Sequence, residues 1–353
     1  MREIRDTRGA GGPIAVATIV AKNCLSFARV LAQSFRQYHP NVPFFVALSD
    51  EPQGCFDPLA QPFRLLQLSD LPIPELHRFR FQYDRKQLAV AAKPYLLQHL
   101  LDRGFTGAVF LDADMLVLES IDSLLETATR HAITLVPHLT TPLTGPDRAA
   151  RELNILQCGV FNGGCVAVSG SDAASAFLRW WQTRVFSHCV EDLEAGLYFD
   201  QHWLNFAPIY CEDVGILRDT GYNVAHWTMP ERAIRMQEGR AFVGSVPCRL
   251  FHFSGFDPDR PERVTRYSTR LTMSDLGDAS QLFARYTALL ESAGYRDVRA
   301  WPYAWSHFDN GEPISAEARR AYREMGDATQ RFGDPIETAP AGSFYRWYQR
   351  HRF

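Results

Sequence analysis

Little in this sequence points to a secreted, membrane-spanning or nucleic-acid-binding protein. Its seven cysteines are scattered through 353 residues and never form a CxxC pair, which argues against a zinc cluster or a disulfide scaffold and favours reduced thiols. No apolar run approaches the roughly 20 residues that span a bilayer, and the opening MREIRDTRGAGG lacks the apolar stretch of a signal peptide. A net charge of −3 supplies no basic field for a phosphate backbone, so we expect no nucleic-acid partner. We therefore expect a cytoplasmic globular protein, with residues 1–12 as a flexible lead-in.

The start of the chain alternates between strand and helix patterns. The run Ile14–Val20 is rich in β-branched residues and predicts a strand covered on both faces, as in a parallel sheet. Apolar residues then recur at helical spacing, after an Asn23 that could cap the helix and before a Pro40 that stops it. Pro43–Leu48 predicts a second strand, which completes a βαβ unit.

The same patterns continue to about residue 275 and predict an α/β fold. The further strands expected are Phe63–Leu68, Ala108–Leu111, Ile133–Val136, Gly164–Val168 and Arg249–Phe253. The further helices expected are Gln87–Leu101 and Asp172–Phe186. Beyond residue 275 the composition becomes helical and polar. We predict a main domain over residues 13–275, with a Rossmann-like, mixed and mostly parallel central sheet flanked by helices. A small helical appendage is expected over residues 276–353.

Two aspartates directly follow the strand predicted over Ala108–Leu111. In AVFLDADMLVL, Asp112 and Asp114 stand at the carboxyl end of that strand, where open α/β sheets bind their ligands. Apolar residues on both sides bury the base of the pair, and buried charges are costly unless they are paired or bound to metal. Carboxylate oxygens suit Mg²⁺ or Mn²⁺, which can bridge to phosphate oxygens of a substrate. The pair therefore predicts a divalent-metal site, although Asp-x-Asp also occurs by chance.

A phosphatase of the haloacid-dehalogenase type is an alternative for the same pair. Such an enzyme also places Asp-x-Asp after an apolar strand and uses the first aspartate as its nucleophile. Here the pair lies well into the chain rather than at the first strand, and Met115-Leu116 follows it without a threonine. The alternative stays open on these residues alone.

Several segments, in order, resemble retaining glycosyltransferases of the GT-A fold, family 8 and its bacterial relatives. They are ATIVAKNCLSFARVLAQSFRQYHP, AAKPYLLQHLLDRGFTGAVFLDADMLVL, FNGGCVAVS, YFDQHWLN, GYNVAHW and LFHFSGFDP. The resemblance spans most of residues 14–260 and implies that residues 13–275 form a GT-A catalytic domain. It implies transfer of a hexose from a nucleotide-diphospho-sugar, a UDP-sugar above all, with retention of configuration.

The resemblance also assigns roles to individual residues. Asp112, Asp114 and His252 would hold Mn²⁺ or Mg²⁺, and Asp200 and Gln201 would be catalytic, facing the anomeric carbon and the acceptor. Donor contacts would come from Thr18, Asp50, Lys93, Asp112, Asn162, Gly163 and Gly255.

Structural alternatives remain for several of these residues. His252 could be a strand-end histidine satisfied by backbone, and Lys93 a solvent-facing lysine beside a Pro94 that marks a helix start. Asp200 could be a helix N-cap, and the glycines after Asn162 a tight strand connection.

One position departs from the family pattern. Family 8 members continue His-x-x-Gly with a lysine that reaches a phosphate, whereas Pro258 stands at that position here. The phosphate contact would come from elsewhere, with Arg260 and Arg263 as candidates, or would be absent. Donor identity therefore cannot be taken from the family.

The chain closes on GSFYRWYQRHRF, which mixes aromatic and basic residues. Such a segment can lie at a membrane surface, or it can be a closing helix packed on the protein. We predict a bacterial surface-glycan or lipid-linked acceptor and favour the packed helix for this segment, with peripheral membrane contact as the alternative. A catalytically inactive nucleotide-sugar-binding protein is the remaining alternative, and the three predicted metal ligands argue against it.

Overall fold

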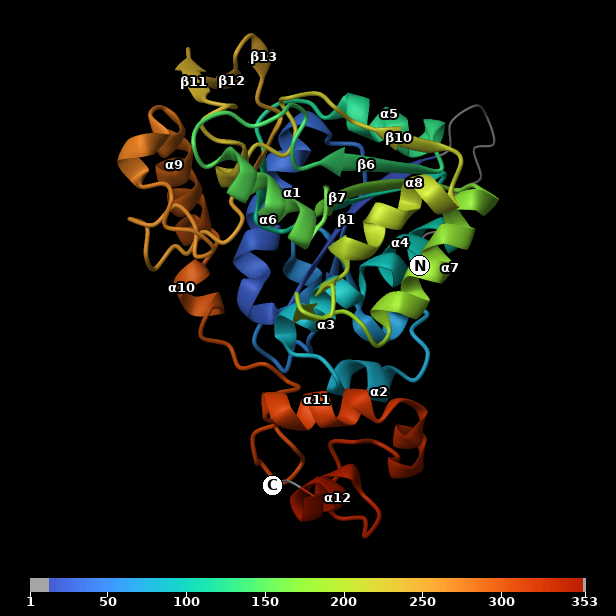
Figure 1. Ribbon diagram of the computed structural model, residues 1–353. Coiled ribbons are helices and arrows are strands. Elements are labelled where there is room, and N and C mark those ends of the chain that lie inside the picture. Colours follow the sequence, from blue (N-terminus) through green and yellow to red (C-terminus); the bar gives the residue numbers. More distant parts are fainter. Residues whose placement is uncertain (1–12, 352–353) are drawn as a thin grey trace.

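The protein is described by a computed structural model over residues 13–351 and is built around a seven-stranded sheet of order β10-β6-β7-β4-β1-β2-β3 (Figure 1). Its strands are β1 (Ile14–Val20), β2 (Phe44–Leu48), β3 (Arg64–Gln67), β4 (Gly107–Leu111), β6 (Ile133–Pro137), β7 (Phe161–Ser169) and β10 (Val214–Ile216). Strand β7 runs antiparallel to β4 and β6, and the other neighbours pair in parallel. The predicted α/β fold with a mixed, mostly parallel sheet is confirmed, and the predicted first strand has the observed bounds.

The remaining strands form small separate sheets. They are β11 (Ile234–Gln237), β12 (Arg240–Val243) and β13 (Val246–Pro247) in one sheet, β5 (Met115–Val117) with β14 (Leu250–His252) in another, and β8 (Glu191–Asp192) with β9 (Leu197–Tyr198) in a third. The strand predicted over Arg249–Phe253 therefore exists as β14 but lies outside the central sheet. It pairs antiparallel with β5, the strand that follows the two aspartates.

Helices connect and cover these strands. The α-helices are α1 (Leu25–Tyr38), α2 (Leu76–Phe81), α3 (Arg85–Ala91), α4 (Lys93–Asp102), α5 (Asp122–Arg130), α6 (Arg148–Cys158), α7 (Asp172–Val185), α8 (Ala207–Tyr210), α9 (Ala279–Ser292), α10 (Tyr295–Val298), α11 (Ala316–Glu324) and α12 (Phe344–His351). Short 3₁₀ helices are η1 (Lys22–Cys24), η2 (Pro58–Ala60), η3 (Leu68–Asp70), η4 (Gln201–Phe206), η5 (His226–Thr228), η6 (Met273–Leu276) and η7 (Gly326–Phe332).

Both faces of the sheet are buried, as the nearly continuous apolar strands require. On β1, Ala15 and Ala17 belong to a core that includes residues of α4 and α7, whereas Val16 and Val20 belong to a core that includes residues of α1 and α5. This alternation follows from the period of two along a strand. The sheet is thus the middle of three layers, and its edge at the carboxyl ends of the parallel strands is left for ligands.

Two local predictions need correction. The helix predicted over Gln87–Leu101 is split at Ala92 into α3 and α4, because Pro94 stands in the first turn of α4, where its missing N–H does no harm. Asn23 does not cap α1; it lies inside η1, and Cys24 precedes α1 without a side-chain cap.

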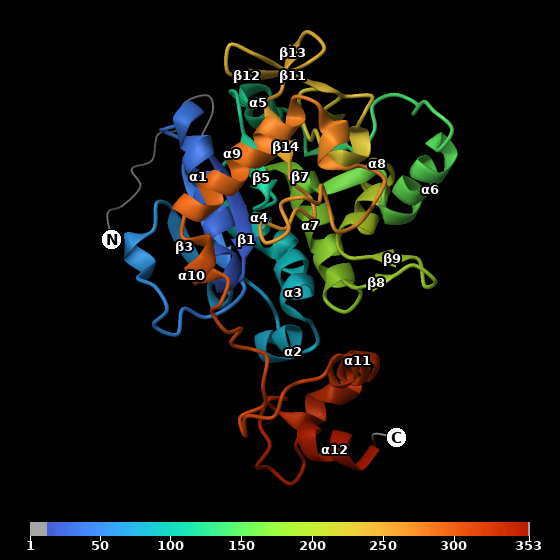
Figure 2. The same cartoon turned by 90° about the vertical axis from the view of Figure 1, so that its left-hand side faces the viewer.

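The helices after residue 276 fall into two groups (Figures 1 and 2). Helices α9 and α10 lie against α1, and Tyr286 of α9 stacks on Phe253 with ring centroids 3.9 Å apart. Helices α11 and α12 form a separate cluster that docks on α2 through Phe81. Within residues 13–351, no helix is both long and apolar enough to cross a membrane. The predicted lead-in, residues 1–12, lies outside the described part of the chain.

Candidate active site

The predicted metal ligands meet at the carboxyl end of β4. Asp112 and Asp114 occupy the turn between β4 and β5, and the antiparallel pairing of β5 with β14 sets His252 opposite Met115. The Nε2 atom of His252 lies 3.1 Å from Asp114 Oδ1 and 3.9 Å from Asp112 Oδ2. One ligand atom from each of the three residues lies within 4.8 Å of the other two. Two carboxylates and an imidazole at this spacing could hold a divalent cation.

His252 is oriented by a second contact. Its Nδ1 atom lies 3.2 Å from the Oδ1 atom of buried Asn223, so Nδ1 donates to Asn223 and Nε2 is left for the carboxylates. Burial alone would lower the pKa of His252, but the neighbouring Asp114 and Asp112 carboxylates outweigh burial and raise it. The carboxylates thus stabilise positive charge at the position where a cation would bind, and a metal ion would displace the proton.

Strand β7 carries the FNGG segment and packs so closely on β4 at Gly164 that no side chain fits there. A Cβ atom at Gly164 would lie 2.3 Å from Asp112 Oδ2 and 2.7 Å from Asn162 Oδ1. The backbone N–H of Gly164 donates to Asn162 Oδ1 over 2.6 Å, and its carbonyl accepts from the N–H of Asp112 over 2.7 Å. Glycine is therefore needed here so that the Asp112 carboxylate can turn toward His252.

Lys93 of α4 and Asp200, the residue before η4, form a buried ion pair. The Lys93 Nζ atom lies 2.6 Å from Asp200 Oδ2 and donates to the carbonyl of Gly163 over 2.5 Å. Lys93 is therefore not solvent-facing, and Asp200 precedes η4 without capping it through its side chain. Burial alone would lower the pKa of Lys93, but Asp200 and Asp112 raise it, so Lys93 is a fixed positive charge.

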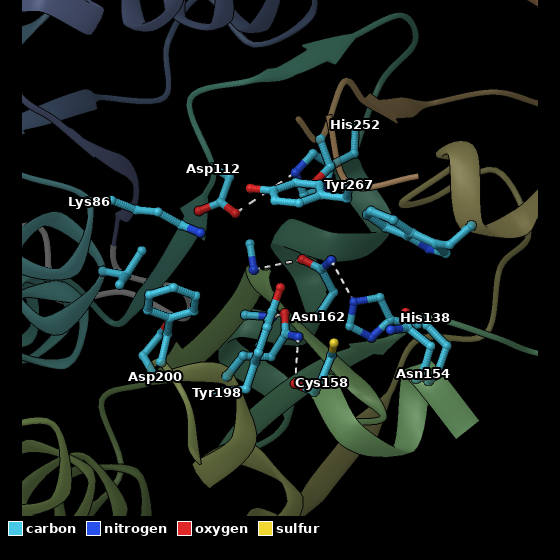
Figure 3. Close-up of a pocket in the computed structure, with 18 of the residues that line it drawn as sticks. Lys86, Asp112, His138, Asn154, Cys158, Asn162, Tyr198, Asp200, His252 and Tyr267 are labelled. Carbon is cyan, nitrogen blue, oxygen red and sulfur yellow. Dashed lines mark hydrogen bonds and ion pairs between the residues drawn. The ribbon is translucent and has the colours of Figure 1, made fainter. Parts of the chain in front are cut away.

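Gln201 is fixed at both ends of its amide. Its Oε1 atom accepts from the N–H of Gly163 over 2.9 Å, and its Nε2 atom donates to the carbonyl of Cys158 over 2.9 Å. Asn162 is held similarly, because its Nδ2 atom lies 3.1 Å from His138 Nε2 (Figure 3). These hydrogen bonds fix the orientation of both amide side chains.

Two cavities meet at Asp112 and His252. The smaller is lined by the predicted residues Lys93, Asp112, Asn162, Gly163, Asp200, Gln201 and His252 (Figure 3). The larger, of about 740 Å³, is lined by Asp112, Asp114, His252 and Gly255 and runs toward the end of β1. Lys86, Ser254 and Tyr267 line both cavities, so the two are parts of one cleft.

Two predicted donor contacts lie away from this cleft. Thr18 shares the face of β1 with Val16 and Val20, so it is buried in the layer beneath α1. Asp50 is buried in an ion pair whose oxygen lies 3.2 Å from Lys22 Nζ. Neither residue lines either cavity, and we withdraw both as direct donor contacts.

The candidate phosphate contacts also change. Arg260 and Arg263 do not line the cleft, whereas Arg266 does. Gly255 allows the chain after β14 to turn back on itself. It has φ +72°, and a Cβ atom there would lie 2.5 Å from Thr265 Oγ1 and 2.6 Å from the Tyr267 ring. Glycine lets the chain fold back so that Arg266 and Tyr267 reach the cluster.

Several cleft residues were not predicted from the sequence. Lys86 lies in α3 and Lys93 in α4, and the break between these helices at Ala92 leaves no common periodicity that could have indicated Lys86. His226 and Trp227 lie in the quoted GYNVAHW segment but were given no role. Arg266 and Tyr267 lie in an irregular segment where no periodic pattern identifies them.

Comparison with known proteins gives distant similarities, and no family model matches the chain. Two uncharacterized proteins of Bacillus subtilis are each 23% identical to it: YfnF over 252 residues, covering 69% of this chain and 81% of YfnF, and YfnD over 197 residues, covering 54% and 60%. Among solved structures, the galactosyltransferase LgtC in complex with donor and acceptor sugar analogs is 17% identical, with a TM-score of 0.46, covering 79% of this chain and 95% of LgtC. The glycosyltransferase GlyE of Streptococcus pneumoniae is 13% identical, with a TM-score of 0.45, covering 83% and 67%. Mouse xyloside xylosyltransferase 1 is 12% identical, with a TM-score of 0.40, covering 69% and 97%.

These three solved structures are described as glycosyltransferases or a xylosyltransferase. With TM-scores below 0.5 they are too distant to assign an activity to this chain. An activity for this chain therefore has to be inferred from the arrangement of its own residues.

We predict that Gly164→Ala displaces the Asp112 carboxylate, because the added methyl group would overlap it. Mn²⁺ affinity should fall by about tenfold or more, and the free energy of unfolding by about 1–3 kcal/mol. Isothermal titration with Mn²⁺ and urea unfolding measure the two effects. Gly342→Ala is the matched control, since a Cβ atom there meets nothing within 4 Å. Equal Mn²⁺ affinity in both variants would contradict the packing argument.

Proposed function

We propose that this protein is a metal-dependent glycosyltransferase of the GT-A type. It would transfer a hexose from a nucleotide-diphospho-sugar, most simply a UDP-sugar, to a glycan or lipid-linked acceptor. The observation that carries the proposal is the cluster of Asp112, Asp114 and His252, of which Asp112 and His252 line both cavities and Asp114 lines the larger one. A donor can then lie with its diphosphate at the cluster, its sugar in the smaller cavity and its nucleoside in the larger one.

Positive charge at the metal ligands and on nearby cations would stabilise the diphosphate as it leaves the sugar. A Mn²⁺ or Mg²⁺ ion on Asp112, Asp114 and His252 would supply positive charge to the diphosphate oxygens. Lys86 and Arg266 line the cleft and form no ion pair with a carboxylate within residues 13–351. Their charges are free to face an anion, and Arg266 takes the part that a lysine at position 258 would play in family 8.

The smaller cavity suits a sugar and an acceptor hydroxyl. Transfer breaks the bond between the anomeric carbon and the diphosphate oxygen and forms a bond from that carbon to the acceptor oxygen. Among the described residues that line this cavity, Asp112 and Asp200 are the carboxylates. Asp112 belongs to the metal cluster, and Asp200 is held by Lys93. Neither is free to attack carbon, so retention here would require the departing diphosphate, and not an enzyme carboxylate, to assist the incoming hydroxyl by accepting its proton.

The alternative functions are less favoured. A phosphatase would use Asp112 as its nucleophile, yet this carboxylate is enclosed with Asp114 and His252 in one set of ligands. An inactive binding protein would have no physical reason to keep three such ligands together with a buried Lys93–Asp200 pair beside them.

The packing of the C-terminal helix α12 is relevant to whether the protein meets its acceptor at a membrane. In α12, Phe344 is buried and Trp347 and Tyr348 pack on the same aromatic cluster, whereas Arg346 and Arg350 are exposed. This arrangement favours a closing helix over rings inserted in a membrane. Peripheral membrane contact and a cytoplasmic location stay predictions from the sequence.

Thermal unfolding in the presence of UDP-, GDP- and TDP-sugars, with and without Mn²⁺, tests the proposal. We expect one of these donors to raise Tm by several degrees only when Mn²⁺ is present. Asp114→Ala should abolish the shift, because it removes one metal ligand. If none of these donors shifted Tm with Mn²⁺, the proposed function would be wrong.

Arg266 can be tested separately. Arg266→Ala should weaken binding of the nucleoside diphosphate by about tenfold, in the range of a lost charge-assisted hydrogen bond. Mn²⁺ binding in the absence of nucleotide should stay within about twofold of wild type, since Arg266 is not a ligand. Arg263→Ala serves as the control because Arg263 lies outside the cleft. An equal loss in both variants would indicate only a general effect of charge.

A further inference from the structure

The α11–α12 cluster holds the connection between α2 and α3 through two arginines of α11 (Figures 1 and 2). Arg319 is 7% exposed, and its Nη1 atom donates to the carbonyl of Phe81 over 2.7 Å and to that of Tyr83 over 2.8 Å. Arg323 donates from Nη1 to the carbonyl of Gln82 over 3.1 Å. The carbonyls of three consecutive residues at the end of α2 therefore accept hydrogen bonds from guanidinium groups of a helix much later in the chain.

Arg319 is a buried cation whose hydrogen bonds go to the backbone. Its Nη2 atom donates to the carbonyl of Trp305, and it forms no ion pair with a carboxylate within residues 13–351. Burial lowers the pKa of Arg319, because a charge is costly to bury unless hydrogen bonds replace its hydration. A guanidinium presents its N–H donors in a rigid fork, so one side chain can bind several carbonyls at once. Arg319 thus ties the α2–α3 connection to the segment between α10 and α11.

Helix α3 is short and depends on what holds its first turn. It has seven residues, well below the roughly 12–15 that an isolated helix needs in water. The N–H of Gln87 donates to Asp84 Oδ1 over 2.8 Å, and the N–H of Asp84 donates to Gln87 Oε1 over 3.1 Å. Arg319 binds the carbonyl of Tyr83, directly before this capping residue. The position of the first turn of α3 therefore depends on Arg319.

Lys86 lies in this first turn and reaches the cleft. Its Nζ atom lies 4.0 Å from the centroid of the Phe199 ring and 5.6 Å from that of the Tyr267 ring. Lys86 lines both cavities. The metal ligands stand elsewhere, in the turn after β4 and on β14. A shift of α3 would therefore displace the ammonium group of Lys86 and leave the metal ligands in place.

We propose that Arg319 is a positioning residue for the cleft. By fixing the end of α2 it sets the position of Lys86, so that the α11–α12 cluster takes part in binding the anionic part of the substrate. The ion pair between Arg78 of α2 and Asp327 contributes less to this, because the Asp327 carboxylate is exposed to solvent. That Lys86 meets a diphosphate rests on the proposed function, whereas the fixing of α3 by Arg319 does not.

Hydrogen exchange of the backbone amides of α3 tests whether Arg319 fixes this helix. In Arg319→Met, which keeps an unbranched side chain and removes the donors, these amides should exchange about tenfold faster than in the wild type. Arg319→Lys should give an intermediate rate, because an ammonium keeps the charge without the fork. The amides of β4 should exchange at the wild-type rate in both variants, which distinguishes a local effect from general destabilisation.

Arg320→Ala is the matched control, because Arg320 is the neighbouring residue on α11 and is exposed. This variant should exchange its α3 amides as the wild type does. Wild-type exchange of α3 in both Arg319→Met and Arg319→Lys would overturn the inference.

Binding of inorganic pyrophosphate in the presence of Mn²⁺ tests the link to Lys86. Lys86→Ala should weaken binding by about tenfold and Arg319→Met by about three- to tenfold. Both variants should bind Mn²⁺ alone within about twofold of the wild type, because neither residue is a metal ligand. The double variant should bind pyrophosphate within about twofold of Lys86→Ala, since Arg319 acts through Lys86.

The outcomes separate the inference from the proposed function. Losses that add up in the double variant, or wild-type pyrophosphate affinity in Arg319→Met, would overturn the inference alone. A wild type that bound no pyrophosphate with Mn²⁺ would overturn the proposed function, and the hydrogen-exchange comparison would still decide whether Arg319 positions α3.

Discussion

The convergence of Asp112, Asp114 and His252 on one point is the constraint on which the rest of the site depends. The turn after β4 brings both carboxylates toward His252, where one oxygen of each lies within 4.8 Å of the imidazole nitrogen. Like charges at this distance are costly in a half-buried position unless a cation lies between them. Strand β14, Gly164 and Asn223 all serve to hold the three groups together. The protein thus maintains an arrangement that a divalent cation would stabilise.

The cleft around this cluster holds unpaired cations together with the two carboxylates. Lys86 and Arg266 line it, whereas Lys93 is paired with Asp200 at the smaller cavity. A divalent cation on Asp112, Asp114 and His252 would leave this part of the cleft with an excess of positive charge. That excess is the reason for proposing a substrate that carries a diphosphate.

The sequence was sufficient for the sheet, because β-branched runs form buried strands, and for the position of Asp112 and Asp114 at a strand end. His252 was expected beside them only from the family resemblance, and its role as a metal ligand stays a prediction. The sequence was insufficient where a side chain's surroundings depend on distant segments. Thr18 was assigned to the donor although its alternation with Val16 and Val20 already directed it to the opposite layer. Arg266 and Tyr267 reach the cleft through an irregular segment, whose course depends on tertiary contacts and is not encoded in any short periodicity.

Magnetic resonance of bound Mn²⁺ tests the central claim most directly, because it detects the nuclei that surround the ion. The account predicts coupling to a ¹⁴N nucleus of His252, lost in His252→Ala, and coupling to ³¹P when the nucleoside diphosphate is added. Mn²⁺ that binds without nitrogen coupling, or that shows no phosphorus coupling in the presence of the nucleotide, would contradict a metal centre on Asp112, Asp114 and His252 that holds a diphosphate.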